Sequence, residues 1–345
     1  MTSDRGIPPE KIVQAADRSG FSVSGAQLHR WRSQGLIPRP KVRGLGRGRG
    51  ATSFYPAGTD LQVVSLCELL KKDRRLDLAA MALFFQGYPV SVELLKRILM
   101  ETADRRDKET SGLVTDTGLT SNGVDVLDKI VLGRLKSKPL AQARNRLRRS
   151  KFESFIRLLI FVAAGRSPDF LEDGDGAVAD SMVLKRGLGI EAALQTWMKV
   201  DDGDLQSAIN NLAAHFNSAA LRSTITESGD AALNTGRDEL LIVWQALMDM
   251  KACFLLLDKR DALGLRALPE IDFTQSTPMA PAMLLVWLHL KQLPEVAETL
   301  PKVIASAAMV SNLRNLLDNH PKLAHRLIKP LGVMLGLVGG LLGSA

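Results

Sequence analysis

The sequence has little cysteine and histidine, and these shortages exclude several kinds of site. Its two cysteines, Cys67 and Cys253, form neither a disulfide framework nor a CxxC metal pair, which is typical of a reducing compartment. The five histidines are scattered and join no cysteine cluster, and no nucleophile motif accompanies them. We therefore expect no metal, no cofactor and no enzymatic activity, with a helical catalytic domain kept as an alternative.

Long apolar runs are also missing. The first residues, MTSDRGIPPEK, lack the apolar core of a signal peptide. The longest uncharged apolar stretch, residues 330–345, is short for a membrane span and contains five glycines. We therefore expect a cytoplasmic protein without membrane association, in which residues 330–345 form a packed terminal helix or a frayed tail.

Positive charge is concentrated near the N-terminus. The 345 residues carry a net charge of +8, and residues 1–50 alone hold ten Lys/Arg against three Asp/Glu. No acidic residue lies between Gln27 and Tyr55, where seven residues are basic. Such a segment suits a polyanion, and nucleic acid is the expected partner. A second basic run, residues 129–151, is interpreted as a solvated helical face, with a backbone contact to nucleic acid as the alternative.

The basic segment begins with two predicted short helices. The first starts at Pro8-Pro9 and stops at Gly20. The second follows the capping-box pattern of residues 24–27, SGAQ, and runs to about residue 34. Its apolar positions Leu28 and Trp31 share a face and are expected to be buried. Two short helices joined by a tight turn indicate a helix-turn-helix.

Glycine and proline exclude a helix in the next segment. Residues 38–50 contain two prolines and four glycines, and Thr52, Phe54 and Tyr55 then favour a strand. This pattern predicts a two-stranded wing. Helices are predicted from residue 59, over 74–85 and over 91–106.

Strand patterns are almost absent from the remaining chain, which indicates a mainly α fold. We predict a DNA-binding domain over residues 1–106, a polar linker over 107–123 and an all-helical C-terminal body over 124–345. Predicted helices of the body lie near residues 125–136, 140–165, 177–187, 189–200, 204–222, 236–258, 280–290, 293–306, 311–318 and 321–337.

Three stretches of the N-terminal region resemble the MerR family of winged helix-turn-helix regulators. Residues 28–38, LHRWRSQGLIP, match the end of the family's second helix and its Gly-Leu-Leu/Ile-Pro turn. Residues 53–56, SFYP, followed by Asp60-Leu61, match the end of the wing and the next helix, and residues 87–95, GYPVSVELL, echo a later turn. Arg30 and Trp31 replace the family's paired tyrosines, and the wing is longer and richer in glycine and arginine.

The resemblance implies sequence-specific binding of double-stranded DNA by a homodimer, in transcriptional regulation. The body would serve dimerisation, ligand sensing or partner binding, with a small molecule or a protein as effector. A helix can read base edges in the major groove, and wing arginines can contact phosphates or a narrow minor groove. The candidate DNA-binding residues are Gln27, His29, Arg30, Arg32, Arg39, Lys41, Arg43, Arg47, Arg49 and Tyr55.

Two further alternatives remain open. One is an architectural DNA-binding protein of the excisionase-like or partition type, which would use the same N-terminal region. The other is a protein-interaction scaffold in which the helical body dominates. A steep dependence of binding on salt would distinguish DNA binding from a scaffold, because phosphate contacts release counterions.

Overall fold

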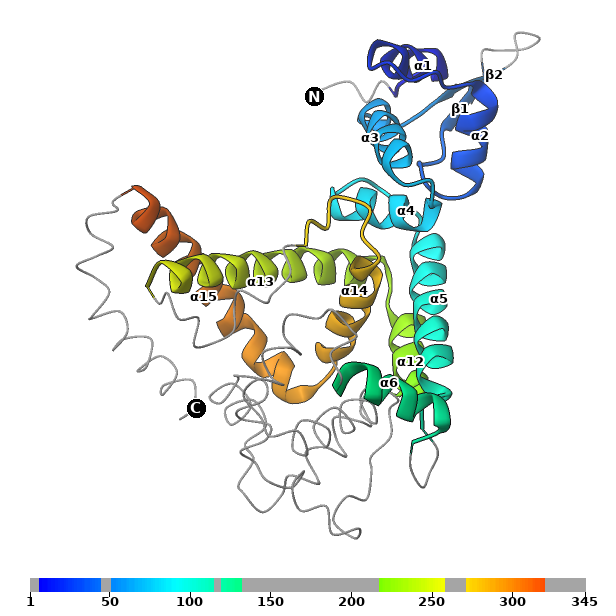
Figure 1. Cartoon of the computed structure of the whole chain (residues 1–345). Helices are drawn as coiled ribbons and strands as arrows, with labels where there is room; N and C mark the ends of the chain where they lie inside the picture. The colour runs from blue at the N-terminus through cyan, green and yellow to red at the C-terminus, as the bar shows by residue number, and fades with distance from the viewer. Residues whose placement is uncertain (1–5, 45–50, 115–118, 132–216, 258–270, 320–345) are drawn as a thin grey trace, which may run out of the picture. The chain divides into compact units, whose positions relative to one another are not determined.

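A computed structural model describes residues 6–44, 51–114, 119–131, 217–257 and 271–319 (Figure 1). Within these ranges the protein contains ten helices and one two-stranded antiparallel sheet. The predicted mainly α fold is therefore confirmed at this level. None of the described helices is long and apolar enough to cross a membrane.

Helices precede and follow the two strands in the described part of the chain. The helices are α1 (Pro9–Arg18), α2 (Gly25–Ser33), α3 (Thr59–Lys72), α4 (Leu76–Phe85), α5 (Val92–Ser111), α6 (Ser121–Val131), α12 (Ser218–Glu227), α13 (Asp230–Leu257), α14 (Met279–Leu290) and α15 (Pro294–Asn319). The strands are β1 (Lys41–Gly44) and β2 (Ala51–Phe54).

The chain forms two compact units. The first combines Met1–Thr102 with two later segments, Ile225–Arg237 and Ile271–Leu288. The second comprises Ala103–Thr224, Asp238–Glu270 and His289–Ala345. The first unit therefore holds α1 to α4, the β hairpin and the candidate site, together with segments far along the chain that the sequence did not indicate as its neighbours.

The N-terminal helices of the first unit pack through small apolar faces. α1 begins after Pro8, buries Ile12 and Ala16 completely, and contacts α3. α3 in turn buries Val63 and Leu66. Ile12 and Ala16 are four residues apart and therefore share one face of α1.

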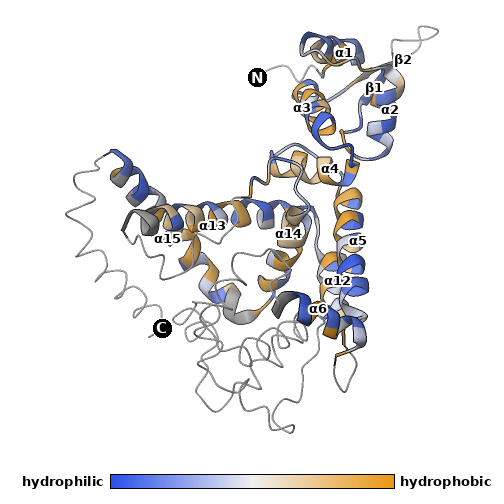
Figure 2. Ribbon diagram, viewed as in Figure 1, coloured by the Kyte–Doolittle hydropathy of each residue, from blue (hydrophilic) through white to orange (hydrophobic). Residues whose placement is uncertain are grey.

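α4 is an almost entirely buried helix of the first unit. Every residue from position 78 to position 85 is buried, and Figure 2 shows apolar colours along the helix. Phe85 stacks on Phe273 with ring centroids 4.9 Å apart. The guanidinium of Arg237 lies 5.0 Å from the ring centre of Phe84 and donates a 3.1 Å hydrogen bond to the Phe84 carbonyl oxygen at the end of the helix. Both later segments therefore contact α4.

α13 begins at Asp230, six residues before the start predicted from the sequence. Gly236 lies inside the helix, and a Cβ atom there would come within 2.6 Å of a methyl carbon of Leu288. The glycine permits a close contact with α14 and does not mark a helix end. α15 also differs from its prediction, because one helix runs through residues 307–310, where two helices were expected to be separate.

Polar contacts join the helices of the second unit. Asp249 of α13 is buried and accepts hydrogen bonds of 2.6 Å from both Ser311 and Arg314 of α15. Arg222 of α12 pairs with Asp104 of α5 at 2.8 Å. These ion pairs and hydrogen bonds connect helices that are distant in the sequence.

Several predictions concern residues at or outside the edges of the described ranges. Of the predicted linker, residues 107–111 belong to α5 and residues 121–123 to α6. The helices predicted over 140–165, 177–187, 189–200 and 321–337, and the tail 330–345, lie outside the described residues. The domain boundaries stay a prediction.

Candidate nucleic-acid interface

The start of α2 is fixed by a reciprocal capping box. The Ser24 hydroxyl accepts a 3.2 Å hydrogen bond from the backbone N–H of Gln27, and the Gln27 side-chain oxygen accepts a 2.8 Å hydrogen bond from the backbone N–H of Ser24. Two N–H groups that the helix cannot satisfy internally are thereby paired. The capping box predicted from the sequence is confirmed.

α2 has one buried face and one exposed face. Leu28 and Trp31 are 2% and 7% exposed, as the sequence predicted. His29 and Arg30 are exposed, and Arg32 is half-buried. Neither Arg30 nor Arg32 makes a side-chain hydrogen bond or ion pair within the described residues. The exposed face of α2 therefore presents uncompensated positive charge.

Gln27 is exposed, yet its side chain already has a structural role. Pairing with adenine in the major groove needs the amide oxygen as acceptor and the amide nitrogen as donor. The Gln27 oxygen holds the N-terminus of α2 in the capping box. We therefore regard Gln27 as a capping residue first, which leaves His29 and Arg30 as the best placed of the predicted residues on α2 to contact bases.

The turn after α2 is hydrogen-bonded to the residue that precedes α5. Gly35 adopts the left-handed backbone conformation with φ of +79°, and its carbonyl oxygen accepts a 2.9 Å hydrogen bond from the backbone N–H of Ser91. A Cβ atom on Gly35 would come within 2.6 Å of the Ser91 hydroxyl oxygen. Only glycine satisfies both the conformation and the close approach at this position.

A buried glutamine of α3 also donates a hydrogen bond to this turn. Gln62 is fully buried, and its side-chain nitrogen donates hydrogen bonds of 2.8 Å to the carbonyl oxygen of Leu36 and 2.9 Å to that of Pro89. The chain leaving α2 is thereby attached both to α3 and to the segment before α5. Because three elements meet here, the direction of α2 is fixed by packing and hydrogen bonds.

The predicted β hairpin is present as β1 and β2. The register pairs Lys41 with Phe54 and Arg43 with Thr52, so both basic residues lie on one face of the hairpin. All four residues of β1 are exposed, and the Arg43 guanidinium lies 6.0 Å from the centre of the Phe54 ring. The hairpin therefore presents two cations on an exposed ribbon.

Arg39 precedes β1 and is exposed, but it faces an acidic residue. The pKa of Glu93 is lowered by a hydrogen bond from its own backbone N–H, by the Ser91 hydroxyl and, more weakly, by the charges of Arg39 and Lys96. Part of the positive field of Arg39 is thus opposed by Glu93. Arg39 is a weaker candidate for binding a polyanion than Arg30.

Tyr55 belongs to the core. Its side chain is 4% exposed, and its backbone forms an isolated antiparallel bridge with Ile7 through hydrogen bonds of 2.7 and 2.8 Å. A ring that is this buried cannot contact DNA. We therefore correct the prediction that Tyr55 binds DNA and assign it a structural role. The other predicted wing residues, Arg47 and Arg49, lie outside the described residues, as does the basic run beyond residue 131.

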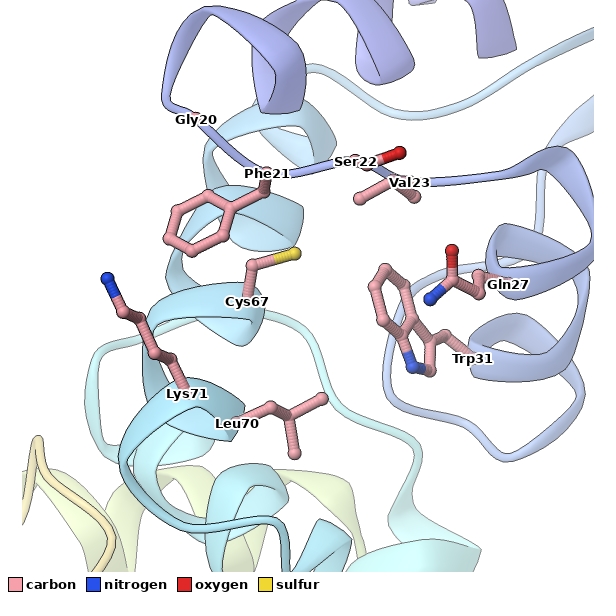
Figure 3. A pocket seen from close by; sticks show the side chains of 9 residues that line it. All are labelled: Gly20, Phe21, Ser22, Val23, Gln27, Trp31, Cys67, Leu70 and Lys71. Atoms are coloured by element: carbon pink, nitrogen blue, oxygen red, sulfur yellow. The ribbon is translucent and has the colours of Figure 1, made fainter.

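A hollow of about 380 Å³ opens beside α2 (Figure 3). Figure 3 shows Phe21 and Cys67 on one side of it and Trp31 and Gln27 on the other. Sequence reasoning missed this feature, because its walls come from three separate segments. The lining residues are Gly20, Phe21, Ser22, Val23, Gln27, Trp31, Cys67, Leu70 and Lys71.

The thiol of Cys67 in this wall is held in its neutral form. Burial is the main cause and the charge of Glu68 adds to it, so that the pKa of Cys67 is raised to about 11. Within the described part of the chain, no cluster of His, Cys, Asp or Glu could hold a metal ion. The chemistry available at this site is binding through cations, amides and apolar surface.

Comparisons of the chain with protein-family models, with curated proteins and with solved structures give no match. The function is therefore inferred from the residues of this interface.

Proposed function

We propose that the protein binds double-stranded DNA, with α1 and α2 acting as a helix-turn-helix and the β1–β2 hairpin as its wing. The observation that carries the proposal is the exposed face of α2, where Arg30 projects without an acidic partner in the described chain. Exposed cations of β1 follow a short distance beyond the end of α2. Their combined field favours a polyanion.

α2 is proposed to enter the major groove. A helix of this diameter fits the groove, and an arginine there can bind the O6 and N7 atoms of guanine together, which is worth about 1–3 kcal/mol of discrimination. Arg30 is assigned this role, with His29 beside it on the exposed face. The capping box and Gln62 hold α2 in one orientation before DNA arrives, which lowers the entropic cost of binding.

The hairpin is proposed to contact the DNA backbone. Lys41 and Arg43 share one face of the ribbon and can approach phosphates, whose contacts fix orientation without reading sequence. Arg47 and Arg49 extend the same basic segment. We expect neutralising Arg47 and Arg49 together to weaken binding to all DNA and to reduce the salt slope by roughly two units.

Transcriptional regulation by a homodimer is the biological role that we propose, on the strength of the resemblance to the MerR family. A dimeric reader binds an inverted repeat because the symmetry of the protein matches that of its site. The helical body would then serve dimerisation or effector binding. The alternative is an architectural protein that uses the same interface without a promoter-proximal palindrome.

Selection of genomic fragments by the purified protein tests this proposal. The full chain is mixed with sheared genomic DNA at near-physiological salt, and retained fragments are sequenced. Enrichment of one short inverted repeat supports a dimeric regulator and supplies its operator. Retention without sequence preference favours the architectural role, and failure to retain DNA contradicts the proposal.

A further inference from the structure

The hollow beside α2 is lined by aromatic and aliphatic side chains together with one lysine. We propose that it binds a planar aromatic carboxylate, with the ring lying between Phe21 and Trp31 and the carboxylate paired with Lys71. The nine lining residues come from the turn after α1, from α2 and from the C-terminal half of α3. All of them belong to the first compact unit.

The size and the walls favour a flat apolar ring. A volume of about 380 Å³ is at the lower end of the range of pockets for small ligands. Phe21 and Leu70 are half-buried, and Trp31 borders the hollow while remaining 7% exposed. Aromatic walls attract a flat ring through burial of area and through stacking or edge contacts.

The polar groups at the rim favour an anion. Lys71 lines the hollow, is exposed and makes no ion pair within the described residues. Its ammonium points away from Trp31 in Figure 3, and rotation about its flexible stem would bring it to the mouth of the hollow. Gln27 accepts a hydrogen bond through its side-chain oxygen. Its side-chain nitrogen remains a donor on the side of the hollow opposite Lys71. Glu68 is exposed on α3 and does not line the hollow.

No lining residue competes as an anion. The raised pKa of Cys67 keeps its thiol neutral at physiological pH, so the wall at that point is a small apolar surface. The remaining lining residues are apolar, glycine, serine or the two donors at the rim. Charge and shape therefore select an aromatic acid over an aromatic cation.

Calorimetric titration of the DNA-free full chain with 2-naphthoate tests the proposal independently of DNA binding. The neutral analogue 2-naphthamide has the same ring system without the charge. We expect 2-naphthoate to bind more tightly than 2-naphthamide. Lys71→Gln should weaken naphthoate about two- to fivefold, which corresponds to an exposed ion pair, and should leave naphthamide unchanged.

A neighbouring lysine supplies the matched control. Lys72→Gln removes the same charge one residue later, from a side chain that donates a 2.8 Å hydrogen bond to Gln275 and does not line the hollow. It should leave naphthoate affinity unchanged. Equal losses in the two lysine variants would reduce the effect to general electrostatics and overturn the proposal.

A variant that fills the hollow tests its location. Cys67→Leu adds side-chain volume to the wall and should abolish naphthoate binding in protein whose circular dichroism matches that of the parent. Full retention of binding by this folded variant would place the ligand elsewhere. Absence of any naphthoate binding by the parent chain would overturn the proposal outright.

Discussion

The side-chain nitrogen of Gln62, buried within α3, donates a 2.8 Å hydrogen bond to the carbonyl oxygen of Leu36, just beyond the end of α2. This contact links the helix proposed to read DNA to the core of its own unit. A second hydrogen bond from the same nitrogen reaches the carbonyl oxygen of Pro89. One side chain therefore closes the turn after α2 and the turn before α5.

Gln62→Leu should destabilise the protein by about 1–2 kcal/mol, because the buried carbonyl oxygen of Leu36 loses its donor, whereas that of the exposed Pro89 can bind water instead. Urea unfolding followed by tryptophan fluorescence measures the change. Gln14→Leu, on the exposed surface of α1, serves as control and should lie within about 0.5 kcal/mol of the parent. Equal stabilities of the two variants would contradict the role given to Gln62.

Gly35→Ala should cost more stability than Gly20→Ala. Both glycines have left-handed backbone angles, φ of +79° and +81°, so each alanine is strained by about 1 kcal/mol or more. A Cβ at Gly35 also meets the Ser91 hydroxyl at 2.6 Å, whereas a Cβ at Gly20 has no atom within 4 Å. Thermal unfolding of the two variants measures the difference, and a larger loss at Gly20 would refute the packing described for Gly35.

The Asp249 cluster should make stability depend on pH in acid. Burial alone would raise the pKa of Asp249, but hydrogen bonds from Ser311, Arg314 and Gln245 outweigh it, and the net pKa is lowered. A lowered folded-state pKa stabilises the protein above the unfolded value near 4, and this contribution is lost as pH falls through the folded-state pKa.

Asp249→Asn should therefore destabilise the protein by about 1.5–3 kcal/mol at pH 7, since hydrogen bonds to a charged group are lost. The difference from the parent should shrink as the pH is lowered below about 4. Urea unfolding at several pH values measures it. A difference that stays constant down to pH 2 would show that the charge of Asp249 makes no contribution.

Cys67 should react slowly with alkylating agents in the folded protein. Only the thiolate is nucleophilic, and a pKa of about 11 leaves roughly a hundredfold less thiolate at pH 8 than an ordinary cysteine has. Mass spectrometry of peptides after timed exposure to iodoacetamide measures the rate, with urea-unfolded protein as the reference. Equal rates in folded and unfolded protein would show that burial does not protect this thiol.

Local features of the candidate site were predictable from the sequence. The capping box of α2 depends on residues three apart, and Leu28 and Trp31 share a face because of helical periodicity. Glycine and proline after residue 38 correctly excluded a helix where the hairpin forms. Each of these predictions uses contacts within a few residues, where pattern and propensity carry the information.

Features that depend on distant contacts were not predictable. Tyr55 was expected at the interface, yet its pairing with Ile7 places it in the core. A helix was expected to begin only at Gly236. In the structure Gly236 lies inside α13, and its missing side chain leaves room for Leu288. In both cases the partner lies far along the chain, and nothing in the local pattern identifies it.

Fluorescence anisotropy of labelled duplexes, titrated at several salt concentrations, tests the central claim most directly. Three variants of the full chain are compared with the parent: Arg30→Ala on α2, Lys41→Gln/Arg43→Gln on β1, and the control Arg97→Ala, whose exposed side chain lies 3.9 Å from Glu101.

We expect Arg30→Ala to reduce the preference for the selected sequence by about 1–3 kcal/mol. The hairpin double variant should weaken all duplexes and reduce the salt slope by up to about two units, and Arg97→Ala should change neither. Parent-like affinity and salt slope in both the α2 and the hairpin variants would contradict the proposed DNA interface.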